Sequence, residues 1–429
     1  MQNNRNINEL FDFISESPTA YHAVKSVICA LENDGYTELF ETERWTLTPG
    51  GKYFVIRNGT SVIAFRYKGD ASPFMIVASH SDSPAFRVKA SGFSKSGAYT
   101  RLAVEKYGGM ILYSWFDRPL SIAGRAVVKT DDGIESRLVN VDRDLAVIPS
   151  VAIHMNRSVN EKFSPNPAVD LIPLVSLNTE MSLNKLIADE LCVAEEDIIS
   201  HDLFLYNREC ARSFGLNGEY FTCPRFDNLG CVYTSLKAFL NSYESAATPV
   251  LAVFDNEEVG SQTKQGAEST FLSNVLERII PDRSQYLESL ASSFMVSADN
   301  AHAKHPNHPE LSDAENAPLL GGGVVIKHNA NQKYATDAVS FAVFEEIVKR
   351  SEVRTQNYYN RGDMPGGSTL GSISDTKVSV PTVDIGIPQL AMHSAVESAA
   401  VSDVFEMQNA LTRFYSSSID VKGSKIVIK

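Results

Sequence analysis

The segment PVLAVFDNEEVGS, residues 249–261, joins an apolar run to a cluster of carboxylates. The run up to Phe254 is typical of a buried strand, and Asp255, Glu257 and Glu258 follow it at once. Adjacent glutamates that leave a strand point in different directions, so one can ligate a metal ion while its neighbour handles a proton. The alternative is an acidic, solvated turn. The rest of the sequence decides between these two interpretations.

Length and charge narrow the classes of protein to consider. The chain has 429 residues, 43% of them hydrophobic, which predicts two domains rather than one core. A net charge of -13 argues against nucleic acid and anionic membranes as partners, because polyanions are repelled. The cysteines are scattered without a CxxC pair, and the start, MQNNRNINEL, lacks the features of a signal peptide. We therefore expect a cytoplasmic protein with reduced thiols and no membrane span.

Two kinds of secondary-structure pattern alternate along the chain, one α/β and one β-rich. Helical periodicity over 7–31 and a hairpin around Asn58-Gly59 lead into an apolar strand at 74–79, and α/β patterning returns after residue 222. Short strand-like runs fill the region between, interrupted by a helix pattern at 183–190. We predict an α/β catalytic domain formed by 1–87 and 223–429, with a β-rich domain, 88–222, inserted into it.

Other metal-binding side chains also lie near strand ends. SHSDSP, residues 79–84, places His80 and Asp82 just past an apolar run, on the same side of an extended segment. His80 could bind a metal ion while Asp82 orients its ring, or it could be an ordinary core histidine. Asp299 and His393 follow two further apolar runs. Asp227 precedes a helical pattern, so it could be a metal ligand or, alternatively, the N-cap of that helix.

These residues are expected to converge, because ligands of open α/β sheets collect at the carboxyl ends of the strands. Two histidines and three carboxylates suit two divalent ions that share one bridging carboxylate. The absence of cysteine from the set favours zinc, manganese or cobalt over a structural Cys-zinc site. Paired ions would lower the pKa of a bridging water, and a free glutamate would accept its proton.

Six motifs in this order resemble the M18 metallopeptidases, the aspartyl aminopeptidases. They are SHSDSPAFRVK, PRFDNLGC, FDNEEVGS, SADNAHAKHPN, VIKHNANQKYAT and AMHS. The resemblance runs from the first helices to the last one. It implies a zinc-exopeptidase-like catalytic domain, with a central mixed sheet flanked by helices, and an inserted β-rich dimerisation domain. It also implies a homo-oligomer in which dimers assemble into a dodecamer.

The resemblance further assigns roles to individual residues. One metal ion would be held by His80 and Asp299 and the other by Glu258 and His393. Asp227 would bridge the two ions, and the Asp227–Asn228 peptide bond would be cis. Glu257 would be the general base, and Asp82 would orient His80. The residues bordering the substrate would be His302, Lys327 and Tyr334, joined by His154 from a neighbouring subunit.

The implied reaction is removal of one N-terminal residue from a peptide, preferentially aspartate or glutamate. Because salt screens distant charges over about 8 Å, charges in the pocket rather than the net charge decide whether an acidic side chain binds. Lys327, helped by His154 or His302, could supply that charge. The alternatives are the same chemistry with a preference for neutral residues, or an inactive binding or scaffold protein. A glycosidase using Glu257 and Glu258 is disfavoured, because adjacent residues are poorly placed to flank a sugar bond.

Overall fold

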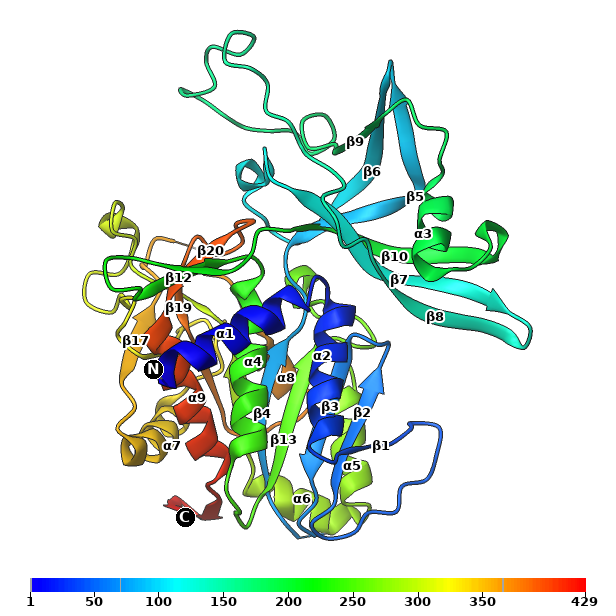
Figure 1. The fold of residues 1–429 in the computed structure, drawn as a ribbon. Coiled ribbons are helices and arrows are strands. Elements are labelled where there is room, and N and C mark those ends of the chain that lie inside the picture. The colour runs from blue at the N-terminus through cyan, green and yellow to red at the C-terminus, as the bar shows by residue number, and fades with distance from the viewer. Residues whose placement is uncertain (1, 70, 365) are drawn as a thin grey trace.

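A computed structural model of the protein describes residues 2–69, 71–364 and 366–429. Within these residues the fold is α/β, as predicted, with mixed sheets flanked by helices (Figure 1). The largest sheet of the described chain has nine strands. In spatial order they are β1 (Thr37–Glu38), β2 (Lys52–Arg57), β3 (Ser61–Arg66), β13 (Thr248–Phe254), β4 (Phe74–His80), β14 (Phe294–Ala298), β18 (Thr382–Gly386), β16 (Val324–His328) and β17 (Thr355–Tyr359).

Helices cover both faces of this sheet. One face packs against α1 (Gln2–Ser15), α2 (Ala20–Asn33), α4 (Phe226–Asn241), α7 (Ala338–Val348) and α9 (Val401–Tyr415). The other face packs against α5 (Phe271–Ile279), α6 (Arg283–Ala291) and α8 (Leu370–Asp375). Successive side chains of β4 alternate between the two cores, with Met75 and Val77 in the first and Ile76 and Ala78 in the second. A strand buried on both faces must be apolar throughout, which explains the unbroken runs in the sequence.

The strands that carry the carboxylates and histidines are parallel. β4 pairs with β13 on one side, where His80 is opposite Phe254, and with β14 on the other side. β14 in turn pairs in parallel with β18. The four strands therefore end at one edge of the sheet, and the residues that follow them are brought together there.

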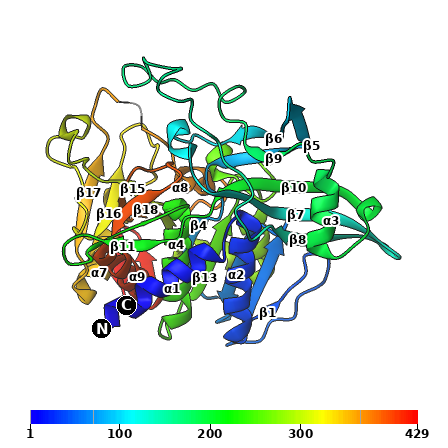
Figure 2. The ribbon, with the colours of Figure 1, turned by 45° about the horizontal axis from the view of Figure 1, so that its top comes forward.

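A second sheet lies apart from the first, above it in Figure 1 and beside it in Figure 2. Its strands are β8 (Gly133–Asn140), β7 (Leu120–Thr130), β10 (Ile198–Asn207), β5 (Ala85–Ser96), β6 (Tyr99–Tyr107) and β9 (Leu174–Leu177), and α3 (Leu183–Leu191) packs on their core. We call this part, residues 85–207, the insert.

Smaller elements complete the chain. A third sheet contains β11 (Arg212–Phe214), β12 (Tyr220–Cys223), β20 (Glu397–Ala400), β19 (Pro388–Leu390) and β15 (Ala301–His302), and β21 (Ile419–Lys422) pairs with β22 (Lys425–Ile428). The 3-10 turns are η1 (Leu112–Trp115), η2 (Glu195–Asp197), η3 (Glu257–Val259), η4 (Pro309–Leu311) and η5 (Lys349–Ser351). None of the described helices is both long and apolar enough to cross a membrane.

Candidate metal centre

The side chains predicted as metal ligands meet at the carboxyl edge of the large sheet. His80 is the last residue of β4, Asp299 comes directly after β14, and Glu258 lies in η3, just beyond β13. His393 follows β19, and Asp227 is at the start of α4. We call these five residues the metal centre.

Asp227 stands between the two histidines. Its Oδ1 is 3.6 Å from His80 Nε2, and its Oδ2 is 3.6 Å from His393 Nε2. His80 Nε2 is also 3.6 Å from Asp299 Oδ1, and His393 Nε2 is 3.5 Å from Glu258 Oε1. Two groups of three ligand atoms therefore share Asp227, and within each group all atoms lie within 4.8 Å of one another.

These distances fit metal ions. Nitrogen and oxygen atoms bound to one tetrahedral zinc at about 2.0–2.1 Å lie about 3.3 Å apart, close to the separations between the histidines and the carboxylates. Asp227 Oδ1 is buried and accepts no hydrogen bond, so it lacks the partner that a buried carboxylate oxygen requires. A cation between Asp227 and each histidine would supply that partner.

Both histidines are held by their other ring nitrogen. His80 Nδ1 lies 3.1 Å from the backbone oxygen of Asp82 and 3.3 Å from its Oδ1. His393 Nδ1 lies 2.9 Å from the backbone oxygen of Gly109. With the proton on Nδ1, each ring donates to these oxygens and directs the lone pair of Nε2 into the metal centre.

Asp82 also fixes the turn that carries the two glutamates. Its Oδ1 accepts from the backbone N–H of Glu257 and its Oδ2 from that of Glu258, each over 3.1 Å. The turn begins at Asn256, whose φ of 62° is left-handed, a conformation that Asn tolerates better than most residues. The side chains of Glu257 and Glu258 are thereby presented from one rigid bend.

Glu397 is a buried residue that sequence patterns did not single out. Its Oε2 accepts from the backbone N–H of Asp227 over 2.9 Å, and its Oε1 accepts from that of His393 over 2.8 Å. Asp227 has non-helical dihedrals, the Asp227–Asn228 peptide bond is cis, and the helix N-cap is Arg225 rather than Asp227. Glu397 thus places two residues of the metal centre, and no spacing in the sequence signals this role.

The buried carboxylates shift one another's pKa. Burial raises the pKa of Glu257 to about 8; His80 opposes this rise, whereas Asp299 adds to it. Burial also acts to raise the pKa of Asp299, but Lys327 and His80 outweigh it and lower the pKa to about 2. Burial acts to lower the pKa of His393, yet Asp227 and Glu258 raise it to about 10. This excess of negative charge favours bound cations.

A cavity of about 260 Å³ opens beside the metal centre. The predicted substrate residues His302, Lys327 and Tyr334 line it together with Glu257. Lys327 is 3% exposed, and its Nζ lies 3.7 Å from Asp299 Oδ2 and 5.5 Å from the centre of the Tyr334 ring. A buried ammonium group therefore faces the cavity from the side of Asp299.

His154 is not among the residues that line this cavity. It is exposed and lies in the insert, in the long connection between β8 and β9.

Tyr358 and Thr369, which the sequence did not indicate, do line the cavity. Thr369 is fixed by buried Asp384, which accepts from its hydroxyl over 2.6 Å and from the backbone N–H of Ala335 over 2.5 Å. Asp384 thus ties together the two loops that carry Thr369 and Tyr334.

Comparisons with known proteins agree with this geometry. The family model described as Aminopeptidase I zinc metalloprotease (M18) matches residues 13–415. A Clostridium acetobutylicum protein named "Probable M18 family aminopeptidase 2" is 44% identical over 423 residues, covering 95% of this chain and 98% of its own. A chain in a cryo-EM structure of the Ape4 and Nbr1 complex has a TM-score of 0.92 at 36% identity, and the match covers 95% of this chain and 85% of that chain. A dodecamer of mApe1 from S. cerevisiae has a TM-score of 0.82 at 27% identity, covering 95% of both chains.

Proposed function

The chain belongs to the M18 family of zinc aminopeptidases, and we propose that it removes the N-terminal residue of peptides, preferentially aspartate or glutamate, at a dinuclear centre bridged by Asp227. The observation that carries this proposal is the placement of the Asp227 carboxylate. Its two oxygens face His80 and His393 separately, each at 3.6 Å, as a carboxylate shared by two ions must. His80 and Asp299 would complete one site, and Glu258 and His393 the other.

Two divalent ions per chain are proposed, zinc first, with manganese or cobalt as alternatives. The ligand atoms are nitrogen and oxygen, which all three metals accept. When bound, such ions lower the pKa of a shared water and polarise the carbonyl of the scissile peptide bond. The two buried cysteines do not enter the ligand groups: Cys231 donates to Asn300, and Cys223 lies in β12.

Glu257 is proposed as the general base. It lines the cavity beside the metal centre, its backbone is fixed by Asp82, and its carboxylate lies close to His80 and Glu258. Its pKa of about 8 in the metal-free protein results mainly from burial, and nearby cations would lower it. Glu257 would take the proton of the attacking water and return it to the leaving amine.

The preference for acidic residues is assigned to Lys327. Its ammonium group is buried, and the low dielectric of the cavity wall strengthens its attraction to a negative charge. A carboxylate of the substrate would take the place of the water that the ammonium group has lost. Tyr334 and His302 border the same space and can donate hydrogen bonds to that carboxylate. Part of the charge of Lys327 is already offset by Asp299, which keeps a preference for neutral residues as the alternative.

Residues 88–222, which include most of the insert, are proposed as the oligomerisation domain, with 1–87 and 223–429 as the catalytic domain. The connection around His154 exposes apolar side chains, including Val151, Met155 and Val169, as surfaces that meet another copy do. The dodecamer of the related mApe1 supports an assembly of twelve subunits for this chain as well. In that arrangement His154 would contact substrate in a neighbouring subunit.

Rates on peptides that begin with Asp, Glu, Leu or Lys test the proposed function directly. We expect the highest kcat/KM for the two acidic substrates, and we expect Glu257→Gln to retain its metal while kcat falls by about 100-fold or more. The highest kcat/KM on the Leu-initiated peptide would favour the neutral alternative, and equal rates on all four peptides would contradict an acidic preference. Near-normal turnover by Glu257→Gln with bound metal would exclude Glu257 as the base. Absence of turnover in the metal-loaded wild-type protein would favour the inactive scaffold.

A further inference from the structure

One short segment of the insert, Tyr107–Gly109 at the end of β6, contacts the surroundings of the metal centre. The Tyr107 hydroxyl donates to Asp82 Oδ2 over 2.7 Å and accepts from Asn256 Nδ2 over 2.9 Å. Two residues further on, the backbone oxygen of Gly109 accepts from His393 Nδ1 over 2.9 Å. One segment of the insert therefore contacts the groups that orient both histidines.

The Tyr107 hydroxyl is one of the hydrogen-bond donors that surround the carboxylate of Asp82. This buried carboxylate already accepts from the turn that presents the glutamates, and it faces the Nδ1 of His80. The hydroxyl is its remaining side-chain donor, and together with His80 it lowers the pKa of Asp82 against the effect of burial. Because Asn256 in turn donates to the same hydroxyl, Tyr107 ties Asp82 to the glutamate turn from the side of the insert.

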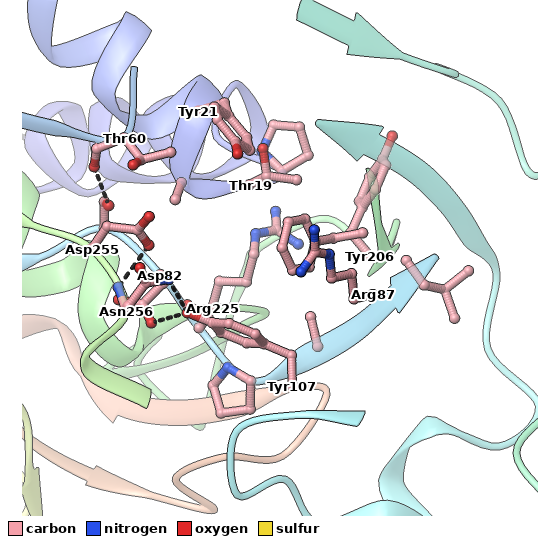
Figure 3. A pocket seen from close by; sticks show the side chains of 18 of the residues that line it. Thr19, Tyr21, Thr60, Asp82, Arg87, Tyr107, Tyr206, Arg225, Asp255 and Asn256 are labelled. Carbon is pink, nitrogen blue, oxygen red and sulfur yellow. Dashed lines mark hydrogen bonds between the residues drawn. The ribbon is translucent and has the colours of Figure 1, made fainter. Parts of the chain in front are cut away.

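The ring of Tyr107 is fixed independently of its hydroxyl. It packs edge-on against Phe204 of β10, with ring centres 5.4 Å apart. Tyr107 borders a cavity of about 490 Å³ between the insert and the catalytic part, and Figure 3 shows Tyr107, Asp82 and Asn256 together at its wall. Without the hydroxyl, water from the cavity could reach Asp82, and the carboxylate would be less firmly held.

The residues after Tyr107 fit closely against the metal centre. Gly108 has a φ of 78°, and a Cβ there would lie 3.1 Å from Cβ of Glu258. Gly109 is outside the left-handed region, and a Cβ there would lie 3.8 Å from His393 Nδ1, an ordinary contact. The backbone N–H of Ile111 donates to the oxygen of His393 over 2.9 Å, which anchors the segment on its far side.

We propose that Tyr107 and Gly109 are positioning residues of the metal centre, so that the insert sets the orientation of both histidine ligands. This inference rests on the proposed dinuclear centre. Tyr107 acts on His80 and on both glutamates through Asp82, whereas Gly109 acts directly on His393. Docking of the insert against the catalytic part is thus a condition for tight metal binding at both sites.

Zinc affinity in Tyr107→Phe tests the proposal, with Tyr206→Phe as the matched control. Tyr206 is a second tyrosine of the insert at the same cavity, but its hydroxyl bonds to Asn140 and Arg208, away from the metal centre. Competition with a chelator should show zinc bound about 10–100-fold more weakly by Tyr107→Phe and unchanged in Tyr206→Phe. The visible spectrum of cobalt-loaded protein should change in Tyr107→Phe only, while the melting temperatures of the two metal-free variants agree.

The glycine pair supplies a second test that leaves Tyr107 intact. Gly108→Ala should weaken zinc binding, since its Cβ presses on Glu258, whereas Gly109→Ala should leave it close to wild type. Equal zinc affinity in Tyr107→Phe and Tyr206→Phe, together with an unchanged cobalt spectrum, would overturn the positioning role. A wild-type protein that binds no zinc would instead overturn the proposed function itself, so the two failures are distinct.

Discussion

The carboxylate of Asp82 accepts a hydrogen bond of 3.1 Å from the backbone N–H of Glu257, although the two residues are 175 positions apart in the chain. Asp82 follows β4 and Glu257 follows β13, and the parallel pairing of these strands brings the two ends together. The residue expected to orient a metal ligand therefore also fixes the proposed base. Loss of this contact should affect metal binding and proton transfer at once.

Asp82→Asn tests this double role. An amide offers one acceptor atom instead of two, and its NH2 group would face one of the two backbone N–H groups that Asp82 now accepts from. We expect kcat/KM to fall by about 10–100-fold, with weaker zinc binding. Asp142→Asn is the control, because Asp142 is an exposed partner of Arg208. Equal kcat/KM in the two variants would contradict the role of Asp82.

Lys327→Met tests the acidic preference. Removing the ammonium group should lower the ratio of kcat/KM for Asp-initiated over Leu-initiated peptides by about 10-fold or more, because only the acidic substrate loses a charge partner. The ratio is the informative quantity, since Lys327 also lowers the pKa of Asp299 and its loss affects both substrates through that residue. Lys333→Met, an exposed lysine next to Tyr334, should leave the ratio unchanged. An unchanged ratio in Lys327→Met would contradict the assignment of the acidic preference to Lys327.

The raised carboxyl pKa values predict how pH affects the metal-free protein. Burial raises the pKa of Glu257 from 4.5 to about 8, and burial with Asp227 does the same for Glu397. The folded state thus holds protons that the unfolded state releases across this window, so the free energy of unfolding falls as pH rises from about 5 to about 8. Thermal melting of chelated protein should show this fall, and Glu257→Gln should reduce it.

Zinc should reverse this trend, because the ionised carboxylates are the forms that bind the metal. We therefore expect the zinc-induced rise in melting temperature to grow with pH over the same window. A metal-free melting temperature that rose with pH between about 5 and 8 would contradict the assigned pKa shifts.

The placement of His154 predicts complementation between subunits. His154→Ala should have little activity alone, because each substrate site would lack a contact from its neighbour. Mixed oligomers with Glu257→Gln subunits should regain part of the activity, since some sites combine an intact Glu257 with an intact His154. Failure in oligomers shown to contain both variants would place His154 outside the neighbouring site.

Much of this architecture follows from local patterns. The apolar runs before His80 and Glu257 predict strands buried on both faces, and the rule for open α/β sheets predicts that their ends meet. The hairpin at Asn58-Gly59 and the helix over 183–190 are confirmed as β2–β3 and α3. After β13 the chain forms two helices, α5 and α6, which are separated at Pro281, a residue that cannot continue a helix.

The hydrogen bonds that position the residues of the metal centre and the cavity cannot be predicted from sequence patterns. Glu397 and Tyr107 act by hydrogen bonds to groups far away in the chain, and neither stands in a periodic pattern or a motif of ligand type. Asp384 is similar, since its two partners come from separate loops. Such contacts depend on how strands and loops are packed, which strand and helix periodicity does not specify.

The most direct test of the shared carboxylate is a zinc titration of chelated protein, with hydrolysis of an Asp-initiated peptide followed at each step. A centre bridged by Asp227 predicts that activity returns with zinc and saturates at about two ions per chain. Asp227→Asn should lose this stoichiometry along with the activity. Full activity in the chelated protein, or saturation at one ion per chain, would contradict a dinuclear peptidase centre.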